Sequence, residues 1–343
     1  MSAVKPFLDA DSKGRPSGLK VRRPFRYDHW QMSDHILTYR LADKRQVFSS
    51  GDTNNRLSHT VTVLRVARAI AGGLELNQDL VSAIALGHDI AHCPYGHLGE
   101  HVLSQRLEAL GYPPYDHAKV APFVLQKVGE LDLTYEVLCG TTYHSMRSEV
   151  MEVPVPNEYG VLAIADKSYV LDDTPDYINM FASGRLWESM LISPPAARSL
   201  WNKLHTAKFA LGQTQNERFE CFIQAVIGES LERGEVSFGE SHTARLFNSL
   251  KDLHANELYY RTDLPRDRAL LERVLDKLVA SDIRGNPYLL FALLTDSELL
   301  FVDRFGIGEL TQEDLNIVVA GELSLSDRDD FSFLTYQPQS PDA

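Results

Sequence analysis

Residues 55–103 read NRLSHTVTVLRVARAIAGGLELNQDLVSAIALGHDIAHCPYGHLGEHVL. The pattern predicts a helix over 59–71, because apolar side chains recur there at intervals of three and four residues. Asn77 suits the N-cap of a second helix, which the apolar pattern extends over 80–92. Helical spacing resumes over 97–110. Three successive helices with apolar faces indicate a helical protein.

The residues between and beyond these helices predict where helices break. Pro94 and Gly96 interrupt the chain before the third helix, and Gly111 suits the position after its end. Helical patterns continue at 117–130, 132–142, 157–172, 195–212, 215–233, 243–257 and 266–281. Strand signals are weak, being limited to VMEVPV at 150–155 and IVV at 317–319. The sequence therefore predicts a mainly helical, all-α fold.

The composition is that of a soluble globular protein. The chain has 343 residues, of which 44% are hydrophobic and 24% charged, so it is long enough to bury a substantial core. No run reaches the roughly 18 uninterrupted apolar residues that span a bilayer, and the N-terminal sequence lacks the apolar segment of a secretory signal. The three cysteines are odd in number and far apart. We therefore expect a cytoplasmic protein without disulfides and without membrane contact.

The net charge of −13 is unevenly distributed. Nine acidic residues and two arginines lie between Asp303 and Ala343, which gives −7 for that segment. The first 28 residues instead carry seven Lys or Arg and three Asp. The total charge argues against nonspecific coating by nucleic acid, but it says little about a pocket in which cations are concentrated locally.

Histidines and carboxylates crowd into one part of the sequence. Seven of the twelve histidines fall between His59 and His144. His88 and Asp89 are neighbours at the end of an apolar segment, and Asp166 lies in the apolar segment VLAIADKSYVL. An unpaired buried Asp is costly, so it usually has a partner. Two His and two carboxylates suit Mn²⁺, Fe²⁺, Mg²⁺ or a similar divalent ion, with positions left for water and a phosphate oxygen.

The pattern His59 … His88-Asp89 … Asp166 resembles the signature of the HD phosphohydrolase superfamily. More narrowly, the string HDIAHCPYGHLGE within 55–103 resembles the bacterial dGTPase-type deoxynucleoside triphosphate triphosphohydrolases. Four further segments are similar to that family in order: TYRLADKRQVF (38–48), YDHAKV (115–120), LTYEVLCGTTYH (133–144) and AIADKSYVLDD (163–173). The likeness covers about 25–180 and extends more weakly to 250–260.

The resemblance implies an HD-domain helical bundle with additional C-terminal helices. The domain organisation that follows has an N-terminal arm over 1–24 and an HD-domain catalytic core over 25–180. A helical C-terminal part over 181–335 then packs on the core, and 336–343 form a tail. The resemblance also implies a divalent metal ion as cofactor, held by His59, His88, Asp89 and Asp166.

The resemblance assigns catalytic roles to His97, Glu100 and His117. If a helix begins at His97, the three-residue spacing lets Glu100 orient its imidazole. His97 then donates a proton to the departing nucleoside O5′ or manages the attacking water, and the sequence does not separate these roles. It also leaves open which of His97 and His117 is the proton donor. The simpler alternative is that Glu100 is a favourable first-turn acid of a helix.

Six residues are implied to bind substrate: Gln46, Arg56, His92, Lys167, Tyr169 and Asp173. Arg56 and Lys167 are cations for the triphosphate, and the Gln46 amide suits a sugar hydroxyl. His92 follows His88 by four residues, so on a continuous helix both share one face. The match at Tyr169 and Asp173 requires a gap of one residue. For His101 and His144, a solvated helix position is about as good an explanation as a role in the site.

The function implied is metal-dependent hydrolysis of a deoxynucleoside triphosphate, dGTP or several dNTPs, to deoxynucleoside and triphosphate. One alternative is another HD phosphohydrolase that acts on nucleoside monophosphates, cyclic nucleotides or alarmones. A second is a non-catalytic, nucleotide-sensing HD module. Homo-oligomers, and effector sites for a dNTP or single-stranded DNA, are further properties that the resemblance implies for the family.

Overall fold

The computed structural model describes residues 4–46, 55–144, 156–172, 194–258, 265–283, 285–306 and 327–340. The first helices are α1 (Pro24–Ser33), α2 (Ile36–Arg40), α3 (Arg56–Gly73), α4 (Gln78–Gly87), α5 (His97–Ala109), α6 (His117–Phe123), α7 (Tyr135–Tyr143) and α8 (Asn157–Asp166). The later helices are α11 (Pro194–Leu211), α12 (Gln215–Arg233), α13 (His242–Leu253), α14 (Pro265–Ala280), α15 (Pro287–Leu293) and α16 (Asp296–Phe305). Pairing between extended segments in the described residues is limited to an isolated bridge between Arg45 and Asn55. The all-α prediction is confirmed.

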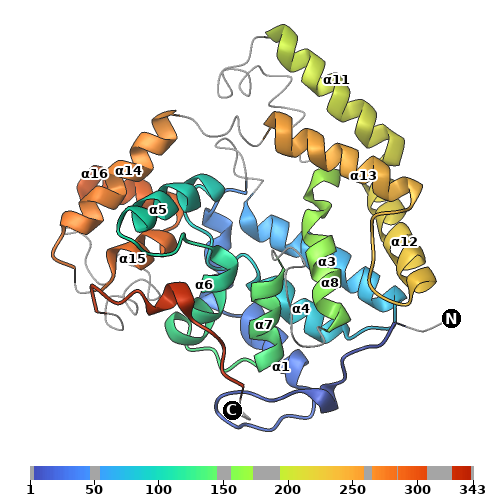
Figure 1. Ribbon diagram of the computed structural model, residues 1–343, viewed down its shortest axis with the longest axis horizontal. Coiled ribbons are helices and arrows are strands. Elements are labelled where there is room, and N and C mark those ends of the chain that lie inside the picture. Colours follow the sequence, from blue (N-terminus) through green and yellow to red (C-terminus); the bar gives the residue numbers. More distant parts are fainter. Residues whose placement is uncertain are drawn as a thin grey trace.

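Helix α4 lies at the centre of the fold, between α1, α3, α7 and α8 (Figure 1). Val63 and Ile70 of α3 and Leu80 of α4 are fully buried in the core, and burial of each side chain of this size contributes about 1.5–3 kcal/mol. Helix α7 approaches α4 closely because residue 140 is a glycine: a Cβ there would lie 2.4 Å from Ile84 Cδ1. This contact brings the end of α7 beside the end of α4.

The helix ends follow the capping residues visible in the sequence. The Asn77 side chain accepts hydrogen bonds from the backbone N–H groups of residues 79 and 80, and Gly111 has the positive φ of +85° that suits the turn after α5. The prediction of one helix over 80–92 is wrong beyond Gly87. From there the backbone makes tight three-residue turns, in which Ile90 N donates to Gly87 O and His92 N to Asp89 O.

Helices α1, α2, α15 and α16 were not predicted, and the last two are tied to the N-terminal part. Arg40 and Glu298 form a two-pronged ion pair, with distances of 2.7 and 2.6 Å. Asp296 Oδ1 accepts a hydrogen bond from Tyr95 N at 2.9 Å, and its Oδ2 accepts one from Arg45 Nε at 2.8 Å. Asp296 therefore holds the turn that leads into α5.

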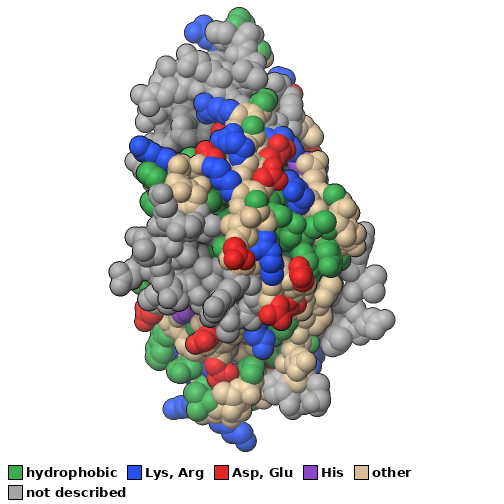
Figure 2. Space-filling model, turned by 90° about the vertical axis from the view of Figure 1, so that its left-hand side faces the viewer, with side chains coloured by type: hydrophobic (Ala, Val, Ile, Leu, Met, Phe, Trp, Pro, Cys, Tyr) green, Lys and Arg blue, Asp and Glu red, His purple; other side chains and the backbone are tan. Residues whose placement is uncertain are grey.

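The side of the molecule that carries α14 and α16 is shown in Figure 2. Acidic and basic side chains are interspersed on this face, with hydrophobic side chains between them. Asp303 pairs with Arg273 at 2.9 Å and with Lys277 at 3.1 Å, which links the two helices. Among the described residues, no helix is both long and apolar enough to cross a membrane.

Candidate metal centre and active site

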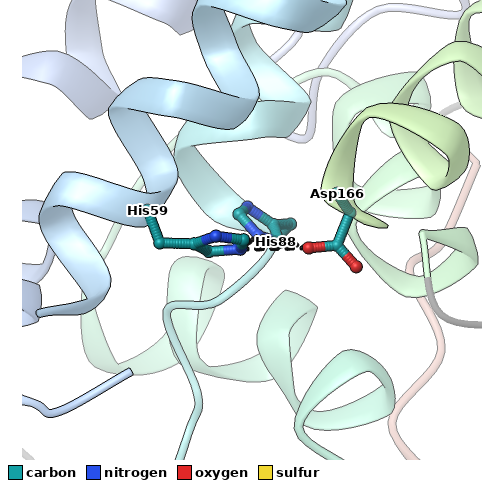
Figure 3. A group of neighbouring side chains, drawn as sticks. All are labelled: His59, His88 and Asp166. Carbon is teal, nitrogen blue, oxygen red and sulfur yellow. Dashed lines mark hydrogen bonds and ion pairs between the residues drawn. The ribbon is translucent and has the colours of Figure 1, made fainter. Parts of the chain in front are cut away.

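Three side chains from separate helices converge at the centre of the bundle (Figure 3). His59 lies in the first turn of α3, His88 directly follows α4, and Asp166 is the last residue of α8. His59 Nε2 lies 3.0 Å from Asp166 Oδ1 and 3.4 Å from His88 Nε2, and His88 Nε2 lies 3.6 Å from the same carboxylate oxygen. We name this set the ligand group.

The spacing and chemistry of the ligand group fit a divalent ion. Ligand atoms about 2.1 Å from one ion and at right angles to each other lie about 3.0 Å apart, and one ligand atom from each residue fits within a 4.8 Å span. His88 Nδ1 lies 2.7 Å from Ala85 O. That backbone carbonyl accepts the Nδ1 proton and leaves Nε2 facing the group, as is usual for histidines that bind metals.

The carboxylate of Asp89 lies next to the ligand group and pairs with Arg56. Asp89 Oδ2 lies 3.7 Å from His59 Nε2, and its Oδ1 lies 3.5 Å from His88 Nε2. The buried guanidinium of Arg56 donates from Nη1 to Asp89 Oδ2 at 2.7 Å. The structure thus brings together all four residues predicted as metal ligands. It also shows that Arg56 contacts one of them, which the sequence did not indicate.

The carboxylates set the electrostatics of this centre. Burial disfavours charge on His88, but the nearby Asp89 and Asp166 carboxylates outweigh that effect and raise the pKa of His88 to about 9. Burial likewise opposes ionisation of Asp166, yet its contacts with His59 and His88 hold its pKa well below the ordinary range. The two carboxylates therefore favour positive charge between them, which a proton or a divalent ion supplies.

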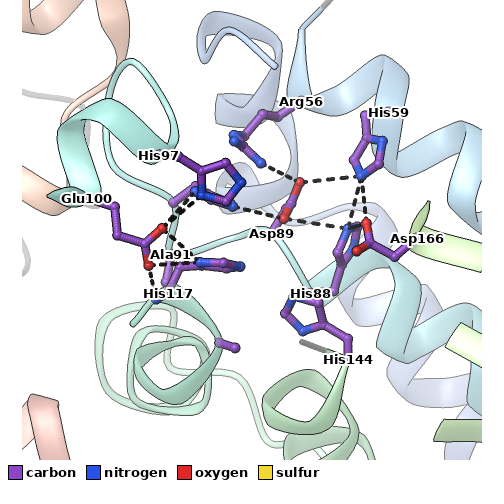
Figure 4. Close-up of polar contacts among 12 residues, drawn as sticks. Arg56, His59, His88, Asp89, Ala91, His97, Glu100, His117, His144 and Asp166 are labelled. Carbon is purple, nitrogen blue, oxygen red and sulfur yellow. Dashed lines mark hydrogen bonds and ion pairs between the residues drawn. The ribbon is translucent and has the colours of Figure 1, made fainter. Parts of the chain in front are cut away.

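A second cluster, which we name the Glu100 group, consists of Glu100, His97 and His117 (Figure 4). Helix α5 begins at His97, as predicted, and His97 Nδ1 lies 3.2 Å from Glu100 Oε2. Glu100 Oε1 also accepts a hydrogen bond from His117 N at 2.9 Å and lies 3.0 Å from His117 Nδ1. Burial lowers the pKa of His117, but the Glu100 carboxylate outweighs it and raises that pKa. Glu100 therefore does more than favour the start of a helix.

His92 lies between the two clusters, but not for the reason that the sequence suggested. Because α4 ends at Gly87, His92 is placed by a turn and not on one helical face with His88. Its Nε2 lies 3.3 Å from Asp89 Oδ1, and its ring stacks on His117 with a centroid distance of 3.6 Å. The chain folds back so that His92 joins Asp89 to the Glu100 group.

The structure describes three of the remaining residues predicted to bind substrate. Lys167 directly follows Asp166 and is exposed. The Tyr169 ring meets the His59 ring edge-on at a centroid distance of 6.3 Å. Gln46 lies near Arg56, whose Nη2 is 3.4 Å from Gln46 O. Asp173 is outside the described residues.

Two histidines in this region were not identified as site residues by sequence reasoning. His144, at the end of α7, is buried, and its ring centroid lies 5.1 Å from that of His88. His254 is also buried, with its ring centroid 6.1 Å from that of Tyr169. Both positions depend on contacts between helices. The sequence signals were the segment similarity around 133–144 for His144 and the weaker likeness over 250–260 for His254. His101 is exposed, as a solvated position would be.

Comparison with known proteins agrees with this architecture. A family model described as HD domain matches residues 56–170. A deoxyguanosinetriphosphate triphosphohydrolase-like protein from Caldanaerobacter subterraneus is 30% identical over 75% of this chain and 71% of its own length. Proteins of the same name from Clostridium perfringens (32% identity, 76% and 74% coverage) and Desulfatibacillum aliphaticivorans (38%, 51% and 54%) also match. The chain therefore belongs to the deoxyguanosinetriphosphate triphosphohydrolase-like family of HD-domain proteins.

Proposed function

We propose that this protein hydrolyses deoxynucleoside triphosphates to deoxynucleoside and inorganic triphosphate. His59, His88, Asp89 and Asp166 hold a divalent ion such as Mn²⁺ or Mg²⁺ in this proposal. When bound, the ion supplies Lewis acidity to the α-phosphoryl group and to the attacking water. The similarity to deoxyguanosinetriphosphate triphosphohydrolase-like proteins supports the substrate class. Assembly into a homo-oligomer and a dNTP or DNA effector remain predictions from the family resemblance. A cytoplasmic location remains a prediction from the composition.

Unsatisfied polar atoms at the predicted substrate positions carry this proposal. The buried atoms Gln46 Oε1, Arg56 Nε and His92 Nδ1 have no hydrogen-bond partner among the described residues. Buried polar atoms are normally paired, so three such atoms beside one ligand group favour a polar ligand. The guanidinium N–H of Arg56 suits a phosphate oxygen, and the carbonyl oxygen of Gln46 suits a donating hydroxyl such as the deoxyribose 3′-OH.

In the proposed reaction, a water molecule attacks the α-phosphorus of the dNTP. A bond forms between the water oxygen and phosphorus, and the bond from phosphorus to the nucleoside O5′ breaks. The departing O5′ must gain a proton, and the attacking water must lose one. The Glu100 group suits this exchange, because Glu100 accepts the Nδ1 protons of both His97 and His117 and leaves their Nε2 atoms for proton transfer. Arg56 and Lys167 offset the negative charge of the triphosphate.

The test is a panel of the four dNTPs with Mn²⁺ or Mg²⁺, followed by separation of the products. Inorganic triphosphate and deoxynucleoside are the expected products. Pyrophosphate with deoxynucleoside monophosphate would place the attack elsewhere and overturn the proposal. Hydrolysis of only monophosphates, cyclic nucleotides or alarmones would support the other HD phosphohydrolase. Binding without turnover would support a sensing module.

A pair of variants tests whether the ligand group is responsible for the hydrolysis measured in the dNTP panel. Asp166→Asn keeps the size of a side chain in the ligand group and removes its charge, so we expect loss of bound metal and of turnover. His101→Ala removes an exposed histidine on α5 and serves as the control. Equal activity of both variants would reject the ligand group as the catalytic centre.

A further inference from the structure

The described part of the N-terminal arm, residues 4–23, runs along the lower edge of the view in Figure 1. Its backbone there meets two buried glutamates, each of which is the second residue of a helix. Glu158 of α8 accepts a hydrogen bond from Phe7 N at 2.9 Å, and Glu136 of α7 accepts one from Lys13 N at 2.7 Å. The arm is therefore bound to the first turns of two helices.

The start of α4 joins the same set of contacts. Asn77 N donates to Glu158 Oε1 at 2.9 Å, so this oxygen accepts from both the arm and the N-cap of α4. The Asn77 amide donates in turn to Phe7 O at 3.0 Å. Tyr159 OH donates to the backbone oxygen of Glu136 at 2.6 Å, which joins α8 to α7 directly. The first turns of α4, α7 and α8 are thus tied together, and we name Asn77, Glu136 and Glu158 the arm anchors.

The opposite ends of the same three helices lie at the metal centre. His88 directly follows α4, and Asp166 is the last residue of α8. His144, whose ring centroid lies 5.1 Å from that of His88, directly follows α7. Eight residues separate Glu158 from Asp166, which is about 12 Å at the helical rise of about 1.5 Å per residue. Because the helix keeps its length, a shift of α8 at its first turn also moves Asp166.

We propose that the N-terminal arm positions the ligand group: through Glu158 and Asn77 it sets α8 relative to α4, and with it the distance from Asp166 to His88. The inference rests on the proposed function, because it assumes that the ligand group binds a metal ion. Metal ligands must lie within about 0.2 Å of their ideal distances. The 3.6 Å between His88 Nε2 and Asp166 Oδ1 therefore suits a shared ion only while the two helices keep their register. Glu158 is a positioning residue that acts through Asp166.

Stability alone does not account for a glutamate at position 158. Glu158 is 0% exposed, and its Oε2 has no hydrogen-bond partner among the described residues. Burial raises the pKa of Glu158, although the N–H groups of Asn77 and Phe7 favour its charged form. A buried carboxylate with one unpaired oxygen contributes little net stability. Two hydrogen bonds to its other oxygen, however, fix the two donors relative to each other.

The arm also has attachments that do not involve the arm anchors. Arg15 and Asp28 of α1 form a buried ion pair at 3.0 Å, and the rings of Phe7 and Phe25 lie 6.0 Å apart between centroids. These contacts hold the arm on α1 when an arm anchor is altered. Variants at Glu158 and Asn77 therefore change the link between the arm and the helices without releasing the whole arm.

The test measures the affinity for Mn²⁺ by titration of the metal-free full chain. Glu158→Met removes the acceptor, and we expect Mn²⁺ to bind about 10- to 100-fold more weakly, as when an outer contact of a metal ligand is lost. Glu158→Gln keeps a carbonyl oxygen for the two N–H donors and should restore most of the affinity. Asn77→Asp keeps the oxygen that caps α4 but removes the N–H that donates to Phe7 O, so binding should weaken about tenfold.

Glu229→Met is the matched control. Glu229 is another buried helical glutamate, and it accepts hydrogen bonds from Gly239 N at 2.7 Å and Ser241 N at 3.1 Å. Its helix, α12, carries no residue of the ligand group. Urea unfolding with a chelator should show lower stability for this variant, while its Mn²⁺ affinity stays unchanged. Glu158→Met should lower both.

The outcomes separate this inference from the proposed function. Unchanged Mn²⁺ affinity in Glu158→Met and Asn77→Asp, or equal weakening in Glu229→Met, would overturn the inference and leave the proposed function standing. Weakening confined to the arm anchors, in a protein that releases no triphosphate from any dNTP, would overturn the proposed function alone. No binding of Mn²⁺ to the unmodified protein would overturn both. If Glu158→Met does not fold, Asn77→Asp decides the matter.

Discussion

The ligand group and the Glu100 group lie on opposite sides of Asp89 and hold their histidines differently (Figure 4). The side chain of His88 is fully buried and faces two carboxylates, at 3.5 and 3.6 Å. The His97 side chain is 71% exposed and has one carboxylate neighbour, Glu100. A buried imidazole between fixed anions suits a bound cation, whereas an exposed one exchanges protons with solvent. In the proposed function, the ligand group would hold a cation and the Glu100 group would transfer protons.

The largest effect is expected at Asp89, because it contacts the ligand group directly and is linked to the Glu100 group through His92. Asp89→Asn removes the negative charge of a predicted ligand, which is also the charge that pairs with Arg56. We expect kcat to fall by about 10⁴-fold or more, as for residues that act as a unit, together with loss of bound metal. Turnover and metal content are measured on the same sample. Asp276→Asn, at an exposed position, is the control. A loss of less than about tenfold would contradict the central role of Asp89.

His97→Ala tests the Glu100 group separately from the ligand group. Removal of a general acid costs about 10²–10⁴-fold in rate, and we expect kcat to fall within that range. Metal content is expected to stay unchanged, because the side chain is exposed and outside the ligand group. The pH profile of kcat should also lose one limb. Loss of metal in this variant would mean that the two sides are not separate.

Arg56→Lys tests the buried cation that pairs with Asp89. Lysine keeps the positive charge but lacks the planar guanidinium. In Arg56 that group donates from Nη1 to Asp89, while its Nε remains for a bound ligand. We expect KM for a dNTP to rise about 10- to 100-fold, the size of one or two lost charge-assisted hydrogen bonds. Steady-state kinetics separate KM from kcat. An unchanged KM would exclude Arg56 from substrate binding.

The smallest expected effect is a pH dependence confined to the ligand group. The pKa of His88 is raised from 6.5 to about 9, so its protonated form stabilises the metal-free protein. That stability is fully present below pH 6.5 and is lost as the pH rises through about 9, on the order of 1.4 kcal/mol per pH unit. Metal must displace the same proton, so affinity should rise about tenfold per unit over this range.

Urea unfolding with a chelator, and metal titration, measure these two trends at pH 6.5, 7.5 and 8.5. They should run in opposite directions. His88→Asn should abolish both slopes, while His101→Ala should keep them. Parallel trends would show that His88 does not carry the proton that the metal displaces.

Local patterns predicted much of the fold. Regular apolar spacing identified α3 and α12, and the side chain of Asn77 caps α4 as its residue type suggests. The short helices α15 and α16 were missed, although Asn286 and Thr295 cap them. Their apolar runs are too short for helical periodicity to stand out, and packing on α14 stabilises them. The same limit concealed the end of α4, where an apolar run continues into tight turns.

The four predicted metal ligands lie together, yet the sequence alone did not place His144. Its burial arises because Gly140 lets α7 approach α4, which is a contact between helices and not a property of either one. The placement of His92 was wrong for a related reason, because an assumed helix gave the wrong direction. Motif spacing thus located the residues that bear the chemistry. Only the packing of the helices showed which of these side chains lie next to one another.

The carboxylate of Asp296 sets a limit on where this domain can be cut and reused. The HD family model covers 56–170, but the turn before His97 is held from outside that range, through the contacts of Asp296 with Tyr95 and Arg45. A gene segment copied or fused at those limits would carry all four predicted metal ligands and still leave that turn without its acceptor. A fragment that keeps this turn intact must therefore extend beyond residues 56–170 and include both Arg45 and Asp296.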